Sequence, residues 1–462
     1  MSSLSSQHVS ERIETALRET KAGPRSLLQC MSDYKVHGAS IAVIHDYQVE
    51  WARGYGVREV GMPDPVDDET LFQACSISKP VSAVAVLRLV EQGRLDLDAD
   101  VNDFLTSWEI PANGTWQPRV TLRQLLSHSA GTSVSWFFGY HPEQDIPSLL
   151  AILNGDLPAN TPAITVTTIP GLQFRYSGGG YSIVQQVLID VMKQPFPQLM
   201  RNLVFEPLSM EHSTYEQYRP SEQWRNSAVG HRASGKLIAG KRHIFPEMAA
   251  GGLWTTASDL ARFSLSLQNA LAGKPDQLLS QQMVHELLTP QRKGDSRGDM
   301  GLGVFVQGEG DTARFGHPGD NLGFSCCWLA LMKEGQGCVI MTNSDNGWSL
   351  QERFLKAVAQ VYEWPSMTSH NKRNDAKTLD IHDNYIGDYE INLNLCLKIT
   401  KTSKTLFLHI PGQSPMELMK ENDATYLLPD MNDTITFVKN ENGHVESLIL
   451  QQELVEVVAI KR

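Results

Sequence analysis

Ser76 and Lys79 are separated by two residues at the start of a long apolar run, and this spacing could support nucleophilic catalysis. A serine hydroxyl becomes a strong nucleophile when a neighbouring group accepts its proton, and residues three apart on a helix share one face. The same S-x-x-K spacing occurs at residues 32–35 and 369–372, so spacing alone identifies no site. Ser76 is therefore either a nucleophile with Lys79 as its base or a helix cap beside a solvated lysine.

The residues on both sides of Ser76 favour the catalytic interpretation. Residues 71–74 look extended, and residues 81–90 are almost all apolar, which predicts a strand or loop that leads into a buried helix. Pro80 is tolerated in the first turn of such a helix. Burial and the positive end of the helix dipole both disfavour an ammonium, so we expect a lowered pKa for Lys79. A neutral Lys79 could accept the proton of Ser76.

Two further stretches could complete such a site. Residues 174–181 place Tyr176 on a glycine-rich loop, and residues 315–321 place His317 at a predicted strand edge. An acyl-transfer site needs a group that passes a proton to the leaving group and N–H donors for the oxyanion. Taken singly, the context favours a half-buried loop aromatic for Tyr176 and a hydrogen-bonded turn residue for His317.

Taken together, the motifs S-x-x-K, Y-x-x and H-x-G in this order resemble the serine β-lactamase and penicillin-binding-protein superfamily. The branch resembled includes class C β-lactamases, D-alanyl-D-alanine carboxypeptidases, D-aminopeptidases and β-lactamase-like carboxylesterases. Residues 120–131 and 251–262 resemble non-catalytic signatures of the same superfamily. The resemblance extends over about residues 36–362.

The resemblance implies catalytic roles for three residues. Ser76 would be the acylated nucleophile, and Lys79 and Tyr176 would share the general-base and general-acid work. It implies neither a metal nor a cofactor. His128 matches a position that looks structural, so we expect a buried, hydrogen-bonded histidine there.

The resemblance also implies a group of residues that hold the substrate. His317 takes the place of a lysine or histidine in the third motif. The oxyanion donors would be the backbone N–H groups of Ser76 and Asp320, the latter following Gly319 on the strand edge.

Two positions depart from the superfamily pattern. Gly178 stands where an asparagine often holds an acylamino carbonyl, and Pro318 lacks the hydroxyl that is common in the third motif. Both departures favour hydrolysis of esters or small amides over a site that grips a β-lactam carboxylate.

We therefore expect a serine hydrolase that acts through an acyl-enzyme on Ser76, on small esters or on D-amino-acid-containing peptides or amides. Two alternatives stay open: a β-lactamase or penicillin-binding protein (D,D-peptidase), and a sensor that is acylated without turnover. A conventional α/β-hydrolase, whose nucleophile lies on a strand–turn–helix elbow, is disfavoured. The zincin motif H-E-x-x-H is absent.

The expected fold is α+β, with two domains and a linker. Residues 1–364 are predicted to form the β-lactamase-like hydrolase domain, an antiparallel sheet flanked by helices with a helical subdomain inserted. Residues 39–44 and 49–55 read as a hairpin of that sheet, and residues 338–342 as a late strand. Residues 365–380 are a predicted linker. Residues 381–462 are predicted to be a small all-β domain, lipocalin-like or a partial barrel, acting as a lid or an oligomerisation module.

Composition limits the expected partners. The net charge is −12 and no basic cluster occurs, which argues against nucleic acid. The longest apolar runs, about ten residues, are too short to span a bilayer, and the N-terminal residues lack signal-peptide features. We expect a cytoplasmic protein with six free cysteine thiols, a small-molecule ester, peptide or β-lactam substrate, and self-association, if any, through the C-terminal β-domain.

Overall fold

The computed structural model describes residues 11–13, 15, 17, 26–218, 221–365, 383–392, 395–402, 405–409, 415–422, 424–428, 433–440, 443–452 and 455–462. The chain forms two compact units, Met1–Met367 and Thr368–Arg462. The predicted linker lies outside the described residues beyond Pro365. The functions assigned to the two units stay predictions.

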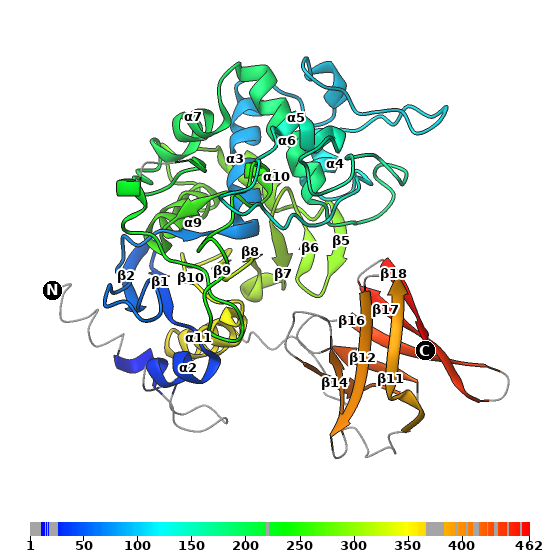
Figure 1. Ribbon diagram of the computed structural model, residues 1–462. Coiled ribbons are helices and arrows are strands. Elements are labelled where there is room, and N and C mark those ends of the chain that lie inside the picture. Colours follow the sequence, from blue (N-terminus) through cyan, green and yellow to red (C-terminus); the bar gives the residue numbers. More distant parts are fainter. Residues whose placement is uncertain are drawn as a thin grey trace. The chain divides into compact units, whose positions relative to one another are not determined.

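The first unit is built on an eight-stranded antiparallel sheet with the order β2-β1-β10-β9-β8-β7-β6-β5 (Figure 1). The predicted hairpin is confirmed, and β1 pairs on its other side with β10, so that Ile41 lies opposite Ile340. The early and late parts of this unit therefore share one sheet, as predicted. The strands are β1 (Gly38–His45), β2 (Gln48–Gly56), β5 (Arg292–Asp295), β6 (Gly298–Met300), β7 (Phe305–Gln307), β8 (Arg314–Asn321), β9 (Phe324–Leu331) and β10 (Gly337–Thr342).

Helices cover both faces of the sheet. In Figure 1, α2 and α11 lie together on one side of it and α9 on the other. The helices are α2 (Leu27–Tyr34), α3 (Ser78–Glu91), α4 (Leu122–Leu126), α5 (Leu149–Asn154), α6 (Gly178–Met192), α7 (Phe196–Met200), α8 (Met248–Gly251), α9 (Ala257–Leu271), α10 (Gln281–Leu288) and α11 (Gly347–Val361).

This double cover explains why β1 is apolar along nearly all its length. Successive strand side chains point to opposite faces. Ile41 packs in the same cluster as Phe354 of α11, whereas Ala42 packs in the cluster of Phe263 of α9. A strand buried on both faces therefore reads as a continuous apolar run.

The predicted buried helix is α3, and it forms the centre of the helical subdomain between β2 and β5. Apart from Arg88, Val90 and Glu91, all its residues are buried. It contacts α6 and α8. A short turn, η1 (Cys75–Ile77), connects it to β3 (Phe72–Gln73), which pairs with β4 (Trp254–Thr255).

The second unit is a closed eight-stranded antiparallel barrel, because β11 pairs with β18. Its interior contains an aromatic cluster in which Tyr385 stacks on Phe437 at 4.2 Å between ring centroids. The strands are β11 (Gly387–Asn392), β12 (Leu395–Thr402), β13 (Thr405–His409), β14 (Met416–Lys420), β15 (Thr425–Leu428), β16 (Asp433–Lys439), β17 (Val445–Gln452) and β18 (Val455–Lys461).

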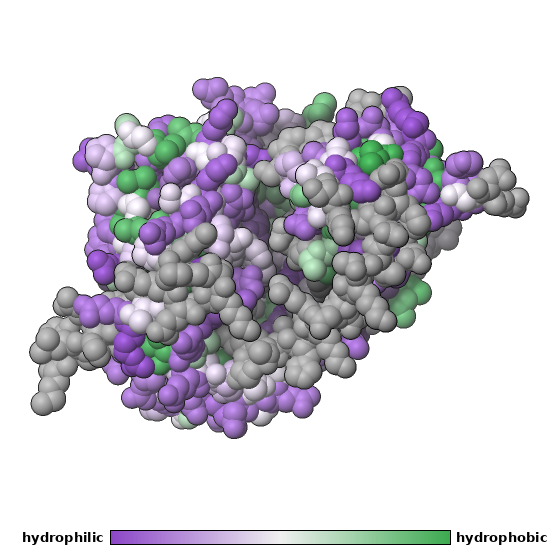
Figure 2. Space-filling model, turned by 90° about the horizontal axis from the view of Figure 1, so that it is seen from below, coloured by the Kyte–Doolittle hydropathy of each residue, from purple (hydrophilic) through white to green (hydrophobic). Residues whose placement is uncertain are grey.

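Among the coloured residues in Figure 2, hydrophilic ones predominate, with small hydrophobic patches between them. Within the described part of the chain, no helix combines the length and the apolar character needed to cross a membrane. The five cysteines whose side chains are described, Cys30, Cys75, Cys326, Cys327 and Cys338, are free thiols.

Candidate active site

Ser76 lies in η1, between β3 and α3, and it is not the N-cap of α3. The N-cap position is Ile77, which makes no side-chain capping bond, so the cap interpretation of Ser76 is wrong. Cys75 has a positive φ of 53°, which is uncommon for a residue with a side chain. Its thiol donates to the Gln73 carbonyl at 3.3 Å, in the buried interior. Strained backbone of this kind clusters at functional sites.

Lys79 reaches back from the first turn of α3 to Ser76. The distance from Lys79 Nζ to Ser76 Oγ is 3.1 Å, and Nζ also donates to the Ala250 carbonyl of α8 at 2.7 Å. Burial, reinforced by the positive charge of Arg297, lowers the pKa of Lys79 to about 7. A large share of this amine is therefore neutral near neutral pH, and a neutral amine can accept the serine proton.

Tyr176 brings the second motif to the same place. Its ring centroid lies 5.0 Å from Lys79 Nζ and 6.2 Å from the His317 ring. The His128 ring packs on it at 4.2 Å, and His128 Nδ1 accepts from the backbone N–H of Ser177 at 3.1 Å. Burial lowers the pKa of His128. As expected, His128 is a buried, hydrogen-bonded residue, and it holds the Tyr176 segment in place.

His317 is a neutral ring in this site. Burial, with the charge of Lys79, lowers its pKa to about 3. Nδ1 lies 2.5 Å from the Pro318 carbonyl, which can only accept, so this contact assigns the proton to Nδ1. Nε2 is then an acceptor, and it is buried without a hydrogen-bond partner among the described residues. His317 therefore offers the site a lone pair and no positive charge.

Gly319 allows strand β8 to lie directly against η1. A Cβ added at Gly319 would stand 2.6 Å from the Ala74 carbonyl oxygen and 3.1 Å from the Ser76 amide nitrogen. Asp320 follows on the same strand, is exposed, and pairs with Ser325. The close approach brings the Ser76 amide next to the strand edge that carries the Asp320 amide.

The space that a side chain at position 178 would need is filled. A Cβ added at Gly178 would lie 2.9 Å from the Phe137 ring. The first amides of α6 are also occupied, because Gly178 N–H donates to the Ser135 carbonyl at 3.0 Å and Gly179 N–H to the Val134 carbonyl at 2.9 Å. This helix start therefore presents an apolar wall where the superfamily pattern has a polar side chain.

The structure thus gathers Ser76, Lys79, Tyr176, His317 and Gly319 from η1, α3, the loop before α6, and β8. Of the other S-x-x-K stretches, Ser32–Lys35 ends helix α2, and residues 369–372 lie outside the described part. Residues 294–298 match the G-x-S-x-G spacing of α/β-hydrolases, but they form the turn of the β5–β6 hairpin. A nucleophile elbow needs a strand followed by a helix, so this match carries no catalytic serine.

Residues 14–361 match the protein family described as Beta-lactamase. The chain belongs to the Beta-lactamase family. Penicillin-binding protein 4* of Bacillus subtilis (strain 168) is 21% identical over 462 residues, covering 95% of this chain and 98% of that protein. The similarity to this relative therefore includes both units.

Several solved structures share the fold of this chain. A crystal structure of SurE with D-Leu aligns over 99% of this chain and 100% of its own, with a TM-score of 0.64 and 24% identity. An octameric penicillin-binding protein homologue from Pyrococcus abyssi aligns over 94% and 98% (TM-score 0.61, 20% identity). D-amino acid amidase from Ochrobactrum anthropi SV3, complexed with L-phenylalanine amide, aligns over 77% and 99% (TM-score 0.61, 19% identity). These likenesses show a shared fold.

Arg297 also contacts the candidate site of this Beta-lactamase family member, although the sequence did not single it out. It lies in the β5–β6 turn, where Asp295 holds its guanidinium, and its Cζ is 4.7 Å from the Tyr176 ring centroid. Its charge lowers the pKa values of Lys79, His128 and His317. No motif spacing connects this turn to Ser76, so only the folded chain reveals the contact.

Replacement of Arg297 by glutamine is expected to move the acid limb of the pH profile to higher pH. In the acyl-enzyme mechanism predicted from the sequence, acylation needs neutral Lys79, so kcat/KM is expected to rise as the pH passes through about 7. Loss of a nearby positive charge raises the pKa of Lys79, so the rise in kcat/KM then occurs at higher pH. Arg292→Gln on the same hairpin is the control, because Arg292 donates to the Gly171 carbonyl instead. Identical profiles for wild type and Arg297→Gln would contradict the charge effect.

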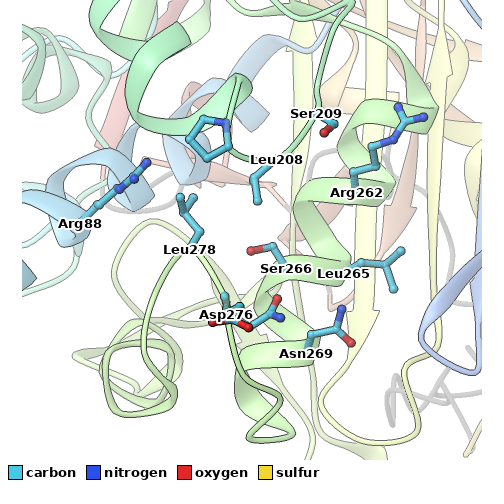
Figure 3. Close-up of a pocket in the computed structure, with 11 residues that line it drawn as sticks. Arg88, Leu208, Ser209, Arg262, Leu265, Ser266, Asn269, Asp276 and Leu278 are labelled. Atoms are coloured by element: carbon cyan, nitrogen blue, oxygen red, sulfur yellow. The ribbon is translucent and has the colours of Figure 1, made fainter.

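A separate pocket of about 420 Å³ lies in the first unit and contains none of the residues of the candidate site (Figure 3). Its two arginines are already engaged. Arg262 pairs with Asp259 at 2.6 Å, and Arg88 donates to the Leu203 carbonyl. Helix α9 contributes Arg262, Leu265, Ser266 and Asn269 to this pocket.

Proposed function

We propose that the chain is a serine hydrolase that works through an acyl-enzyme on Ser76. Ser76 Oγ attacks the carbonyl carbon of an ester or amide while Lys79 accepts its proton, and Tyr176 passes a proton to the leaving group. Water then releases the acyl group. The observation that carries this proposal is the 3.1 Å contact between Lys79 Nζ and Ser76 Oγ, combined with burial that holds the pKa of Lys79 near 7.

The substrate binding we propose uses the third motif. The backbone N–H groups of Ser76 and Asp320 hold the oxyanion. A Cβ built at Gly319 would lie 3.1 Å from the Ser76 amide nitrogen, which supports the proximity of these two N–H groups. Each such donor contributes roughly 10²–10³ in rate. The lone pair of His317 Nε2 accepts from a substrate N–H or a hydroxyl group.

We propose small esters, and peptides or amides that contain D-amino acids, as the substrate class. Gly178 offers no side chain to hold an acylamino carbonyl. Pro318 offers no hydroxyl and His317 offers no charge, so the grip on a β-lactam carboxylate is weakened. Two proteins of this fold add support, because SurE has been solved with D-Leu and another is a D-amino acid amidase.

A second candidate is a β-lactamase or a penicillin-binding protein, and the full-length similarity to penicillin-binding protein 4* favours it. A non-turnover sensor on the same fold would be acylated in the same way. The rate of deacylation separates a sensor from a hydrolase.

Intact-protein mass spectrometry over time tests these proposals. The protein is mixed separately with p-nitrophenyl acetate, p-nitrophenyl butyrate and a fluorescent penicillin, and Ser76→Ala is the control. We expect an ester adduct on the wild type alone that disappears as product accumulates. A penicillin adduct that persists would favour the penicillin-binding or sensor alternative, and an unchanged mass with every probe would refute the acyl-enzyme.

The role of the barrel stays a proposal with two forms. One is a lid or wall for the substrate, and the other is self-association. The description of the Pyrococcus abyssi homologue as octameric supports the second form.

A further inference from the structure

Trp136 is an exposed aromatic residue beside the candidate active site. Its side chain is 56% exposed, and its ring centroid lies 5.8 Å from that of Tyr176. Single exposed apolar residues are common on protein surfaces and need no explanation. Two further features of the segment around Trp136 separate it from that background.

The first feature is that hydrogen bonds hold the backbone of this segment on both sides of Trp136. Before it, Ser177 Oγ donates to the Ser133 carbonyl at 2.8 Å, and Ser133 N–H donates to the Thr165 carbonyl at 2.8 Å. After it, His243 Nδ1 donates to the Phe138 carbonyl at 2.8 Å. The indole is therefore presented from a fixed loop, the usual support of a binding residue.

The second feature is strain in the same loop. Val134 has a φ of 60°, and a β-branched residue in this region is a genuine outlier. Such a conformation persists only where the surrounding contacts enforce it, and it is typical of functional segments. Here the Val134 carbonyl accepts from Gly179 N–H, at the start of the helix that follows Tyr176.

We propose that Trp136 is a specificity-determining residue that receives an aromatic or branched apolar group of the substrate next to the scissile bond. A flat indole edge or face binds such groups through apolar contact and ring packing. The Phe137 ring against Gly178 extends the same apolar wall. This inference rests on the proposed acyl-enzyme function and adds the chemical class of the group recognised.

Matched substrate pairs test the proposal in two arms. One arm compares p-nitrophenyl 3-phenylpropionate with p-nitrophenyl acetate, which differ only in the acyl group. The other compares S-(2-phenylethyl) thioacetate with S-ethyl thioacetate, which differ only in the leaving group. The measured quantity is the preference, the ratio of kcat/KM for the phenyl substrate to kcat/KM for its partner.

Trp136→Ala is expected to lower this preference about tenfold in one arm, which identifies the side of the scissile bond that Trp136 contacts. Trp136→Phe should retain most of it. Phe138→Ala is the matched control, because Phe138 is a neighbouring aromatic with 72% exposure. An unchanged preference in both arms, or an equal loss with Phe138→Ala, overturns the inference. Failure of the wild type to form any adduct on Ser76 would instead refute the proposed function on which it rests.

Discussion

Replacement of Lys79 by methionine is expected to slow acylation of Ser76 by about 10²–10⁴-fold, the usual contribution of a general base. Methionine matches the lysine side chain up to Cε and suits its buried surroundings, so the helix should fold normally. The Ala250 carbonyl loses a donor, which is a small cost beside the loss of the side chain that hydrogen-bonds to Ser76 Oγ. The rate of adduct formation by mass spectrometry measures the effect.

The shorter variant Lys79→Ala distinguishes a lost base from a distorted site. It leaves a space beside Ser76 that a small primary amine can enter, so added propylamine should restore part of the acylation rate. The rescue should grow with the concentration of the unprotonated amine, because only that form accepts a proton. Wild-type acylation rates in Lys79→Met would contradict the assigned role, provided that its circular dichroism matches the wild type.

Replacement of Gly319 by alanine is expected to cost about 10²–10³ in acylation rate, comparable to the loss of one oxyanion donor. The added Cβ would stand 2.6 Å from the Ala74 carbonyl oxygen and 3.0 Å from Cys75 Cβ, so β8 and η1 must separate. Backbone atoms cannot move aside as a flexible side chain can. The amides of Ser76 and Asp320, the proposed oxyanion donors, are then expected to move apart.

Gly251→Ala is the matched control for this substitution. Gly251 lies in α8 beside the site, and its added Cβ would meet nothing closer than the Asn321 amide oxygen at 3.5 Å. The adduct-formation rate and the thermal midpoint are measured for both variants. Equal rates for Gly319→Ala and Gly251→Ala would show that the close approach of β8 to η1 does not position the donors.

Part of the fold could be predicted from local pattern and part could not. The hairpin of β1 and β2 and the buried helix α3 carry strong local signals. Strand β9 was not predicted, because Phe324–Leu331 is apolar without alternation, and periodicity cannot separate such a run from a buried helix. Strands β5, β6 and β7 have four, three and three residues, too few to show a period.

The candidate site divides in the same way. Ser76 and Lys79 are neighbours in sequence, so their types, spacing and apolar context were sufficient to single them out. Arg297 and Trp136 approach Tyr176 only through tertiary packing, and neither belongs to the three motifs that singled out the site. The neutral state of His317 depends on burial, which no short stretch of sequence records.

The pairing of β1 with β10 and the contact of η1 with β8 both join segments that leave the ribosome far apart in time. Ile41 cannot pair until Ile340 has been synthesised, and η1 cannot pack against β8 until Gly319 has been synthesised. Contacts between segments so distant in sequence form slowly, and the unpaired early hairpin is exposed to aggregation in the meantime. A nascent chain released before β8 emerges from the ribosome would carry both Ser76 and Lys79 and still lack the strand that holds His317 and Gly319.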